Sequence, residues 1–507
     1  MILDRPILNR RAILTAGLLG AGLSRWGTAS AMGLTRPGTG AVRTKLAAIG
    51  RTVEEETRAG RATGIAISVA EKGHILWEAG FGAARQGPAI AATAHTPFSL
   101  ASISKTFAAA AVMRLVEVGK LDLDAPIDRY LRSPLPQSHF DAKSVTLRLL
   151  GGHAAGLPTL FDMFDPARPP AAIADLVRSY GELAYPPGER YEYANLGYSL
   201  LGEAVSHVTG RQFPASLNDL VIRPLGLRNT FYDADPARME AAAGRYDQNG
   251  REIPFYTTAT PPSGEVYASA HDLSIFAAHM MGITTEGRGP LLGPKALDTL
   301  FSPVLTSRSK AFTTFGWSGR DVSGERMIAK TGGQPGVAAR LTLLPMRKIS
   351  IAVIANRDDN RDLVAEITSQ IASSLMSDWS NPDFHMDDLP PPDAGPQDCD
   401  GTWTGSIRGG DVSEDIGLLI KAGGASTCRL GNDSARPILD MTNHSPVLTF
   451  GVDGDLSAGA ATDGSPPKMD FKLVARNDGL VGRCLRIRDR PGFTSTEPYI
   501  VTLSRSS

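Results

Sequence analysis

The chain has 507 residues, too many for one hydrophobic core, so more than one domain is expected. Hydrophobic residues make up 42% of the sequence and charged residues 21%, and the formal net charge is -1, which is typical of a globular protein without electrostatic bias. This balance argues against nucleic acid as a partner, because its binding requires a surplus of Lys and Arg.

Residues 1–31 have the composition of an export signal. Arg5 and the pair Arg10–Arg11 precede an apolar run from Ala12 to Leu23, and small residues at 29–31 suit a signal peptidase. The adjacent arginines favour the twin-arginine route over general secretion. The run is shorter than the roughly 20 residues of a membrane span, so no stable membrane anchor is expected, although an uncleaved helix or anchor is the alternative. The interpretation places the mature protein in the periplasm or outside the cell.

Residues 32–376 are predicted to form one α/β (α+β) domain. Apolar runs predict strands at 64–70, from residue 75 onward, at 338–344 and at 349–355. Helical spacing predicts helices over 106–118 and 362–376, and residues 121–300 read as further helices joined by loops. Strands at both ends with helices between them predict a single sheet that the two ends of the domain complete together.

A second domain is expected after a proline-rich linker. Residues 377–398 carry five prolines among acidic and small residues, which is typical of a linker. In residues 399–507, short apolar runs alternate with Gly, Asp, Ser and Pro clusters, which predicts an all-β barrel or sandwich. Its three cysteines, Cys399, Cys428 and Cys484, allow one disulfide in an oxidising compartment, and the sequence does not choose among the three pairings.

The first candidate catalytic element is the S-x-x-K at Ser102–Lys105, at the start of the predicted 106–118 helix. The i,i+3 spacing puts both side chains on one helix face, so the amine can reach the hydroxyl. An apolar helix can bury Lys105 and lower its pKa, which an amine needs before it can accept the serine proton. The same pattern at Ser307–Lys310 and Ser465–Lys468 lies in polar or proline-rich sequence. The simpler interpretation is a serine N-cap beside a surface lysine.

The second element is Tyr193-Ala194-Asn195, the only Y-x-N in the chain, which precedes an apolar helical segment. The phenol of Tyr193 could exchange a proton with Ser102 if nearby cations lower its pKa. The amide of Asn195 could hold both Lys105 and a substrate carbonyl. The alternative is a core aromatic whose hydroxyl is satisfied.

The third element is Lys330-Thr331-Gly332-Gly333, the only K-T-G, placed between two predicted strands. Lys330 and Thr331 offer a cation and a hydroxyl to a substrate carboxylate. Gly332 and Gly333 have no side chains, so backbone N–H groups can approach a developing oxyanion closely. The alternative is a glycine-rich corner with a solvated lysine.

The order S-x-x-K, Y-x-N, K-T-G resembles the serine β-lactamase and penicillin-binding protein superfamily, especially the class C β-lactamases, with related serine esterases and D-amino-acid peptidases. Flanking segments carry the resemblance over roughly residues 45–375: Phe98–Phe107, Leu149–Pro158, Tyr185–Gly202, Pro224–Leu227 and Lys330–Gly336. The resemblance implies a mixed sheet flanked by helices plus a helical lobe, with the active site between them. Gly401–Gly405 and the strand at 499–503 resemble the lipocalin-like barrels appended to some relatives.

The resemblance also implies residue roles. Ser102 would be the nucleophile, and Lys105 and Tyr193 the proton-transfer pair. Substrate would be held by Asn195, Lys330, Thr331 and Gly332, and the backbone N–H groups of Ser102 and Gly333 would form the oxyanion hole. His153 departs from the commoner family pattern by lying in His-Ala-Ala-Gly, and is interpreted as structural. No C-x-x-C or H-E-x-x-H motif is present, so neither a metal nor another cofactor is expected.

These observations predict an exported serine hydrolase that acts through a Ser102 acyl-enzyme on an amide, β-lactam, D-amino-acyl peptide or ester. Many esterase relatives have His where Lys330 stands, so the lysine favours a small-molecule or peptide substrate that bears a carboxylate. The alternatives are a carboxylesterase of the same fold, a penicillin-binding sensor that acylates without efficient turnover, and a structural cell-wall protein with vestigial motifs.

Overall fold

The computed structural model describes residues 40–164, 171–232, 236–285, 287–322, 324–376, 379, 386, 399–421, 424–444, 446–456, 467–477, 479–490 and 493–506. The expected export signal at 1–31 and nearly all of the expected linker at 377–398 lie outside these residues. Within them, every helix is too short or too polar to cross a lipid bilayer.

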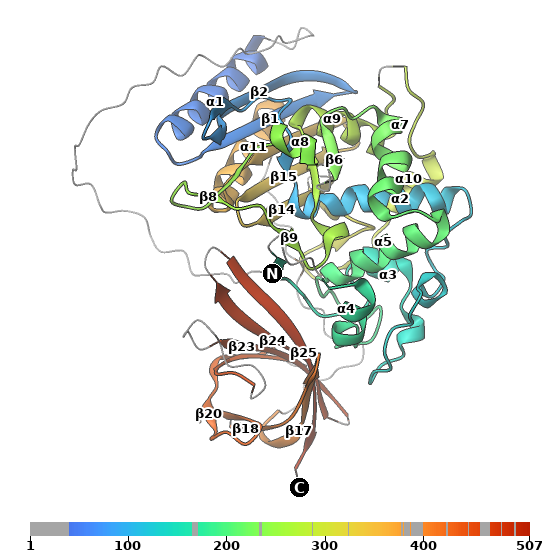
Figure 1. Cartoon of the computed structure of the whole chain (residues 1–507), viewed down its shortest axis with the longest axis vertical. Helices are drawn as coiled ribbons and strands as arrows, with labels where there is room; N and C mark the ends of the chain where they lie inside the picture. Colours follow the sequence, from blue (N-terminus) through green and yellow to red (C-terminus); the bar gives the residue numbers. More distant parts are fainter. Residues whose placement is uncertain are drawn as a thin grey trace, which may run out of the picture.

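A nine-stranded sheet forms the centre of the N-terminal domain (Figure 1). In spatial order its strands are β11 (Leu305–Thr306), β12 (Ala311–Thr313), β13 (Ser318–Val322), β14 (Glu325–Gln334), β15 (Val337–Leu344), β16 (Ile349–Ala355), β1 (Gly64–Glu71), β2 (His74–Gln86) and β3 (Ala89–Ala91). The pairing of β1 with β16 joins the two ends of the domain, which confirms the prediction of one shared sheet. The expectation of a mixed sheet is refined, because each described neighbour pair is antiparallel and most are joined by short turns.

Helices cover both faces of this sheet. On one face α1 (Gly40–Arg58) and α11 (Arg361–Leu375) pack against it, and on the other lie α9 (Ala270–Met280) and, beyond it, α2 (Ser104–Glu117). Because both faces are covered, β15 and β16 are buried along their whole length, so they read as continuous apolar runs instead of alternating ones.

A helical lobe surrounds α2, as the apolar composition of residues 121–300 predicts. Its helices are α3 (Leu147–Gly151), α4 (Ile173–Tyr180), α5 (Asn195–Thr209), α6 (Phe213–Leu217), α7 (Arg223–Leu225), α8 (Pro236–Ala241) and α10 (Pro294–Phe301), with the π-helical turn η4 (Asn218–Ile222). The 3-10 turns are η1 (Ala101–Ile103), η2 (Ile127–Tyr130), η3 (Ala142–Ser144), η5 (Pro261–Ser263) and η6 (Asp358–Asn360). Short strands complete it: β4 (Phe98–Ser99), β10 (Val266–Ala268) and β6 (Thr230–Tyr232) in one sheet, then β5 (Met163–Phe164) with β9 (Thr257–Thr258), and β7 (Arg245–Tyr246) with β8 (Glu252–Ile253).

The C-terminal domain is a nearly closed, nine-stranded antiparallel sheet, which confirms the prediction of a β-barrel. Its order is β20 (Arg436–Pro437), β19 (Thr427–Leu430), β18 (Val412–Ile420), β17 (Gly401–Gly409), β25 (Phe493–Arg505), β24 (Gly479–Arg490), β23 (Lys468–Arg476), β22 (Val447–Asp453) and β21 (Leu439–His444). One apolar core fills it, in which the rings of Phe450 and Phe471 stack at 4.6 Å. In place of a disulfide, the described barrel contains Cys399, Cys428 and Cys484 as buried thiols.

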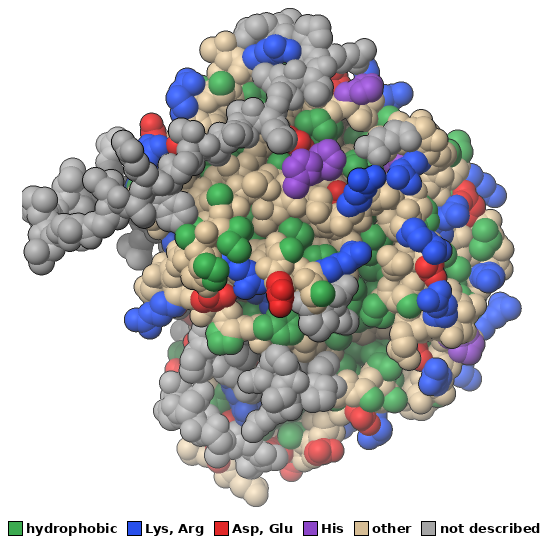
Figure 2. Space-filling view, turned by 45° about the horizontal axis from the view of Figure 1, so that its top comes forward, with side chains coloured by type: hydrophobic (Ala, Val, Ile, Leu, Met, Phe, Trp, Pro, Cys, Tyr) green, Lys and Arg blue, Asp and Glu red, His purple; other side chains and the backbone are tan. Residues whose placement is uncertain are grey.

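The barrel packs against the loops of the helical lobe. Phe161 and Thr496 exchange two backbone hydrogen bonds, of 3.1 and 2.8 Å, and so extend the pairing from one domain to the other. The phenol of Tyr185 donates to the carbonyl of Lys472 at 2.9 Å, and a small apolar cluster joins Tyr185 to Ile500. Elsewhere, basic and acidic side chains are interspersed on the face shown in Figure 2, in keeping with the near-zero net charge.

Candidate active site

Ser102 lies in η1, between β4 and α2, and not in the first turn of the long helix itself. The preceding residue, Ala101, has φ +44°, in the left-handed region that costs a non-glycine residue roughly 1–2 kcal/mol. Buried packing of Ala101 and a hydrogen bond from the Leu100 N–H to the Val266 carbonyl at 2.9 Å hold this conformation. Strain of this kind is typical of functional sites, where it orients a side chain.

Two proton-bearing groups meet the hydroxyl of Ser102. The amine of Lys105 donates to Ser102 Oγ at 3.1 Å, as the i,i+3 spacing predicts. The phenol of Tyr193 donates to the same oxygen at 2.7 Å, from 91 positions further along the chain. The structure therefore brings Lys105 of the S-x-x-K element and Tyr193 of the Y-x-N element together around the hydroxyl oxygen of Ser102.

Burial shifts the pKa values of these two groups in opposite directions, and it favours the neutral form of both. Lys105 is fully buried, and desolvation together with the nearby charge of Lys330 lowers the pKa of its amine well below the ordinary value. Desolvation raises the pKa of the Tyr193 phenol, and the hydrogen bond to Ser102 offsets this only in part. The condition that cations lower the tyrosine pKa is therefore not met: the phenol stays protonated, and the amine is the group that can be neutral.

The segment that carries Tyr193 is held from several sides. The N–H of Ala194 donates to Nδ1 of His153 at 3.2 Å, and the His153 and Tyr193 rings lie 4.3 Å apart. Burial, and then the charges of Lys330 and Lys105, lower the pKa of His153, so its ring is neutral and acts as an acceptor. Thr159 donates a short hydrogen bond to the Tyr193 carbonyl. The Asn195 amide donates to the Leu160 carbonyl at 3.1 Å, which holds this loop against the first turn of α5.

The K-T-G residues lie on β14 beside the Ser102 turn. The Lys330 amine is buried 5.3 Å from the centre of the Tyr193 ring, and burial lowers its pKa to about 8. A Cβ on Gly332 would lie 2.1 Å from the Leu100 carbonyl, so β14 can approach the serine turn only with glycine here. The next residue of β14, Thr331, is exposed.

The sequence motifs missed one direct contact of the site. The Lys105 amine also donates to the carbonyl of Ser263 at 3.0 Å, and Ser263 lies 158 positions away in η5. A backbone carbonyl leaves no mark in the residue type, so no signal in the sequence points to it.

An ion-pair group next to Tyr193 was also missed. The carboxylate of Glu192 accepts hydrogen bonds of 3.1 Å from both Lys472 and Arg483 of the barrel, and all three side chains are less than 10% exposed. Despite the cost of burial, these two cations hold the pKa of Glu192 at about 2. The barrel is therefore bonded directly to the residue before Tyr193.

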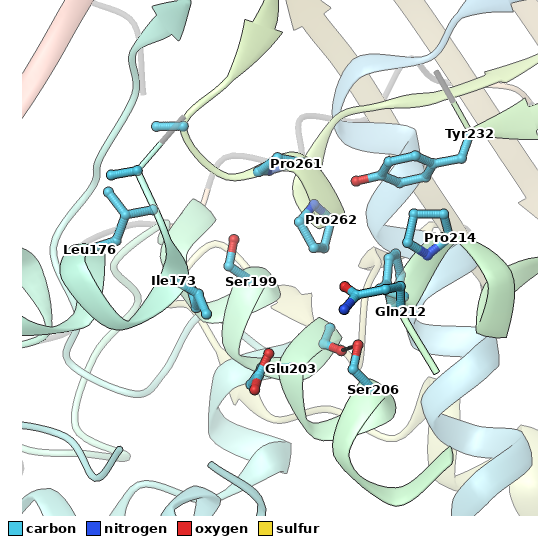
Figure 3. A pocket seen from close by; sticks show the side chains of 14 residues that line it. Ile173, Leu176, Ser199, Glu203, Ser206, Gln212, Pro214, Tyr232, Pro261 and Pro262 are labelled. Atoms are coloured by element: carbon cyan, nitrogen blue, oxygen red, sulfur yellow. Dashed lines mark hydrogen bonds between the residues drawn. The ribbon is translucent and has the colours of Figure 1, made fainter. Parts of the chain in front are cut away.

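A pocket lies near the Ser102 site without including Ser102, Lys105 or Tyr193. It has a volume of about 280 Å³ and is lined by Ile173, Leu176, Ser199, Glu203, Tyr232, Pro261 and Pro262, among others (Figure 3). A single turn separates it from the site, because η5 places Pro261 and Pro262 in its wall and the Ser263 carbonyl on Lys105. The pocket does not contain Ser102. The possible metal ligands among the described residues do not include it either; they are Glu78, His95 and His271. Hydrogen-bond geometry, not pocket volume, locates the site.

Two curated proteins are similar in sequence to 59% and 65% of this chain. The chain is 29% identical to the "Putative beta-lactamase-like 1" of Homo sapiens over 320 residues, 59% of this chain and 63% of that protein. It is 21% identical to "Protein flp" of Staphylococcus aureus (strain N315) over 336 residues, 65% of this chain and 66% of that protein. The chain thus spans slightly less than two thirds of the length of these curated relatives.

Solved structures match the fold at low identity. A class C beta-lactamase aligns with a TM-score of 0.57 at 19% identity, over 66% of this chain and 97% of that chain. SurE aligns with a TM-score of 0.63 at 21% identity, over 92% of this chain and 100% of that chain. The SurE match covers 92% of this chain, whereas residues 1–398 make up only 79% of its 507 residues. The SurE match therefore includes part of the barrel. The match to the beta-lactamase family itself runs from residue 49 to 374 and coincides with the sheet-and-helix domain. Since that match spans well over half of the sequence, the chain belongs to the beta-lactamase family.

Proposed function

We propose that the protein is an exported serine hydrolase in which Ser102 forms an acyl-enzyme. One observation carries the proposal: Ser102 Oγ lies at 3.1 Å from a desolvated amine and at 2.7 Å from a protonated phenol. A serine hydroxyl is a weak nucleophile by itself, and an adjacent base activates it. Members of the beta-lactamase family are usually serine hydrolases, which supports the same reading.

In the proposed reaction the neutral amine of Lys105 removes the proton of Ser102 as its oxygen attacks the acyl carbon. The Tyr193 phenol, protonated in the resting state, delivers a proton to the leaving group and is reprotonated from the Lys105 ammonium. The carbonyl of Ser263 stabilises that ammonium while it exists, because it accepts one of its hydrogen bonds. Water then attacks the ester with the same groups acting in reverse, which releases the acid and restores Ser102.

The remaining motif residues are assigned to substrate. The N–H groups of Ser102 and Gly333 would stabilise the oxyanion of the tetrahedral intermediate. Because Gly332 lacks a side chain, β14 can lie close enough to the Ser102 turn for both groups to reach that oxygen. Lys330 and Thr331 would bind a substrate carboxylate and Asn195 its amide. With a pKa of about 8, Lys330 carries its charge at neutral pH, which supports an anionic substrate.

Two structural neighbours support D-amino-acyl compounds as the first substrates to test. One is a "Beta-Lactamase/D-Alanine Carboxypeptidase from Pseudomonas syringae", and SurE was solved with D-Leu. Both align at 20% identity, so they establish the fold alone, and the substrate remains part of the proposal. A β-lactam or an ester uses the same core residues, and a carboxylesterase is the alternative within this fold.

The test uses the purified full chain and a serine-directed fluorophosphonate probe. Wild-type protein should gain one adduct by intact mass, and Ser102→Ala should gain none. Ser307→Ala is the matched control, because Ser307–Lys310 has the same sequence pattern while Lys310 is exposed and the Ser307 hydroxyl bonds to Ser309. Labelling of Ser102→Ala at the wild-type level would reject the assignment.

A substrate panel then separates hydrolase from sensor. A peptide ending in a D-amino acid, a chromogenic β-lactam and a p-nitrophenyl ester should each be tested, with turnover expected from at least one. A Ser102 adduct that persists after the substrate is exhausted would instead identify a protein that acylates without turnover. Export is tested separately, by the cell fraction that contains the protein and by the N-terminus of the mature chain.

A further inference from the structure

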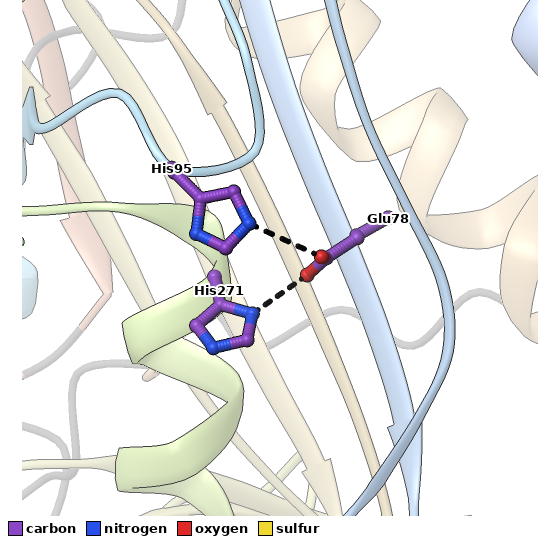
Figure 4. A group of neighbouring side chains, drawn as sticks. All are labelled: Glu78, His95 and His271. Atoms are coloured by element: carbon purple, nitrogen blue, oxygen red, sulfur yellow. Dashed lines mark hydrogen bonds and ion pairs between the residues drawn. The ribbon is translucent and has the colours of Figure 1, made fainter. Parts of the chain in front are cut away.

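Three side chains from three separate elements meet outside the Ser102 site. They are Glu78 of β2, His95 of the turn before β4, and His271 in the first turn of α9 (Figure 4). Nε2 of His95 lies 3.4 Å from one carboxylate oxygen of Glu78, and Nδ1 of His271 lies 2.9 Å from the other. One ligand atom from each residue lies within 4.8 Å of the other two.

We propose that Glu78, His95 and His271 form a binding site for a divalent transition metal ion, and that this ion is Zn²⁺. Two imidazole nitrogens and one carboxylate oxygen are a donor set that zinc accepts, with water in the fourth position. Water has access, because the His95 side chain is 44% exposed, whereas that of Glu78 is only 12% exposed. Zinc bonds of 2.0–2.2 Å hold tetrahedral donor atoms about 3.4 Å apart, so donor atoms that now lie up to 4.8 Å apart must approach each other by up to about 1.4 Å.

Charge favours a cation at this position. The two imidazole rings lie 4.5 Å apart, so protonating both would place two like charges beside a single carboxylate. A neutral imidazole has a lone pair on one nitrogen, and a divalent ion between the rings satisfies both lone pairs and the carboxylate at once.

The backbone holds the two histidines in place before any metal binds. The N–H of His271 donates to the carbonyl of Ala94 at 3.1 Å, so α9 and the turn that contains His95 are bonded to each other. Within that turn the N–H of Thr93 donates to the Thr96 hydroxyl at 3.0 Å, and the N–H of His95 donates to the Thr93 hydroxyl at 3.2 Å. A preorganised site loses less conformational entropy when it binds its ligand.

The position of the site in the fold suggests what the metal does. His95 lies just before β4 and His271 just after β10, and these strands pair with each other through Phe98–Ala268 and Ser99–Tyr267. At the opposite end of the same strand pair, β4 leads into Ser102 and β10 is preceded by Ser263, whose carbonyl bonds to Lys105. The metal would clamp one end of the strand pair that carries both halves of the serine site at its other end.

Binding is tested with untagged full-length protein that has been dialysed against a chelator. Titration with Zn²⁺, followed by isothermal calorimetry, should show one ion per chain, and Co²⁺ should bind with visible absorption bands of a four-coordinate complex. His95→Ala, His271→Ala and Glu78→Gln should each weaken binding at least about 100-fold, because loss of even an outer-shell partner costs 10–100-fold. His74→Ala is the matched control, since His74 is an exposed histidine on the same strand as Glu78 and should leave the affinity unchanged.

Folding and the serine site are monitored independently. His95→Ala removes a side chain that is nearly half exposed, so its circular dichroism should match that of the wild type. In the absence of metal, its Ser102 labelling by fluorophosphonate should also match that of the metal-free wild type. Ser102→Ala should bind Zn²⁺ normally, so failure of the proposed hydrolase function leaves this test intact. Wild-type protein that binds no Zn²⁺, or binds it as weakly as the His95→Ala/His271→Ala double variant, would overturn the proposal.

Discussion

The carboxylate of Glu192 accepts a hydrogen bond of 3.1 Å from the amine of Lys472, although the two residues lie 280 positions apart and in different domains. Glu192 immediately precedes Tyr193, whose phenol donates to Ser102. The barrel therefore contributes to the position of a group in the candidate site without reaching that site itself. Since both charges are buried, removing one of them leaves the other in a medium that solvates it poorly.

Lys472→Met should destabilise the protein and lower its turnover together. We expect a loss of about 2–3 kcal/mol in the free energy of unfolding, less than the roughly 3–5 kcal/mol of an isolated buried pair because Arg483 remains on Glu192. Turnover should fall about tenfold if Tyr193 shifts by a fraction of an ångström. Urea denaturation and steady-state kinetics measure the two effects. Arg326→Met is the control: its exposed pair with Asp321 should contribute no more than about 1 kcal/mol.

Tyr193→Phe should lower kcat/KM about 100- to 10,000-fold, the usual contribution of a proton-transfer group. The change removes one oxygen and keeps the packing of the ring, so the melting temperature should change little. Tyr191→Phe provides the comparison, because Tyr191 is also a phenol whose pKa burial raises, yet its ring faces His153 at 5.9 Å. Equal losses in the two variants would show that the Tyr193 hydroxyl has no special role.

The charge of Lys330 should be visible in the pH dependence of activity. Because burial lowers its pKa to about 8, the amine is protonated below pH 8 and neutral above it. For a substrate with a carboxylate, kcat/KM should therefore fall as the pH rises through about 8, whereas a neutral ester should show no such fall. Lys330→Met should remove the difference between the two substrates. A fall shared by both substrates would assign the titration to another group.

The same shift affects stability with a defined sign. The unfolded chain holds the Lys330 proton up to the ordinary lysine pKa of 10.5, but the folded chain releases it near pH 8. Between these values the unfolded state binds more protons, so this group makes the folded state more stable as the pH rises. Lys330→Met should flatten that part of the stability profile, as measured by thermal unfolding at pH 8 and pH 10.

Gly332 and Gly333 should respond differently to alanine. A Cβ on Gly332 meets the Leu100 carbonyl, part of the backbone that leads into Ser102, and backbone cannot move aside cheaply. Gly332→Ala should therefore displace the serine turn and lower turnover at least about 100-fold. In Gly333→Ala the atoms nearest to the new methyl group belong to the end of the Arg361 side chain, at 3.0 Å, and this flexible group can rotate away. Its turnover should stay within about tenfold of the wild type, and crystal structures of both variants would show which backbone moved.

Sequence patterns predicted the main strands and the Ser102–Lys105 pair, because both depend on interactions between residues that are close in the chain or on burial that repeats along it. The apolar runs at 338–344 and 349–355 correspond to β15 and β16, since strands covered on both faces have continuous apolar sequence. The i,i+3 spacing of Ser102 and Lys105 required only a helical turn to bring the two groups together. The strained Ala101 and the 3-10 turn before α2 were not predicted, because buried contacts from β10 hold them.

By itself, the sequence determined the family, the two-domain architecture and which side chains carry the candidate chemistry, because hydrophobic periodicity and motif order are properties of the chain. The tertiary structure alone decided which partners surround those side chains: the Ser263 carbonyl on Lys105, Lys472 and Arg483 on Glu192, and Glu78 between His95 and His271. Each of these contacts joins residues far apart in the chain. They depend on how whole elements pack, and packing leaves no local pattern in the sequence.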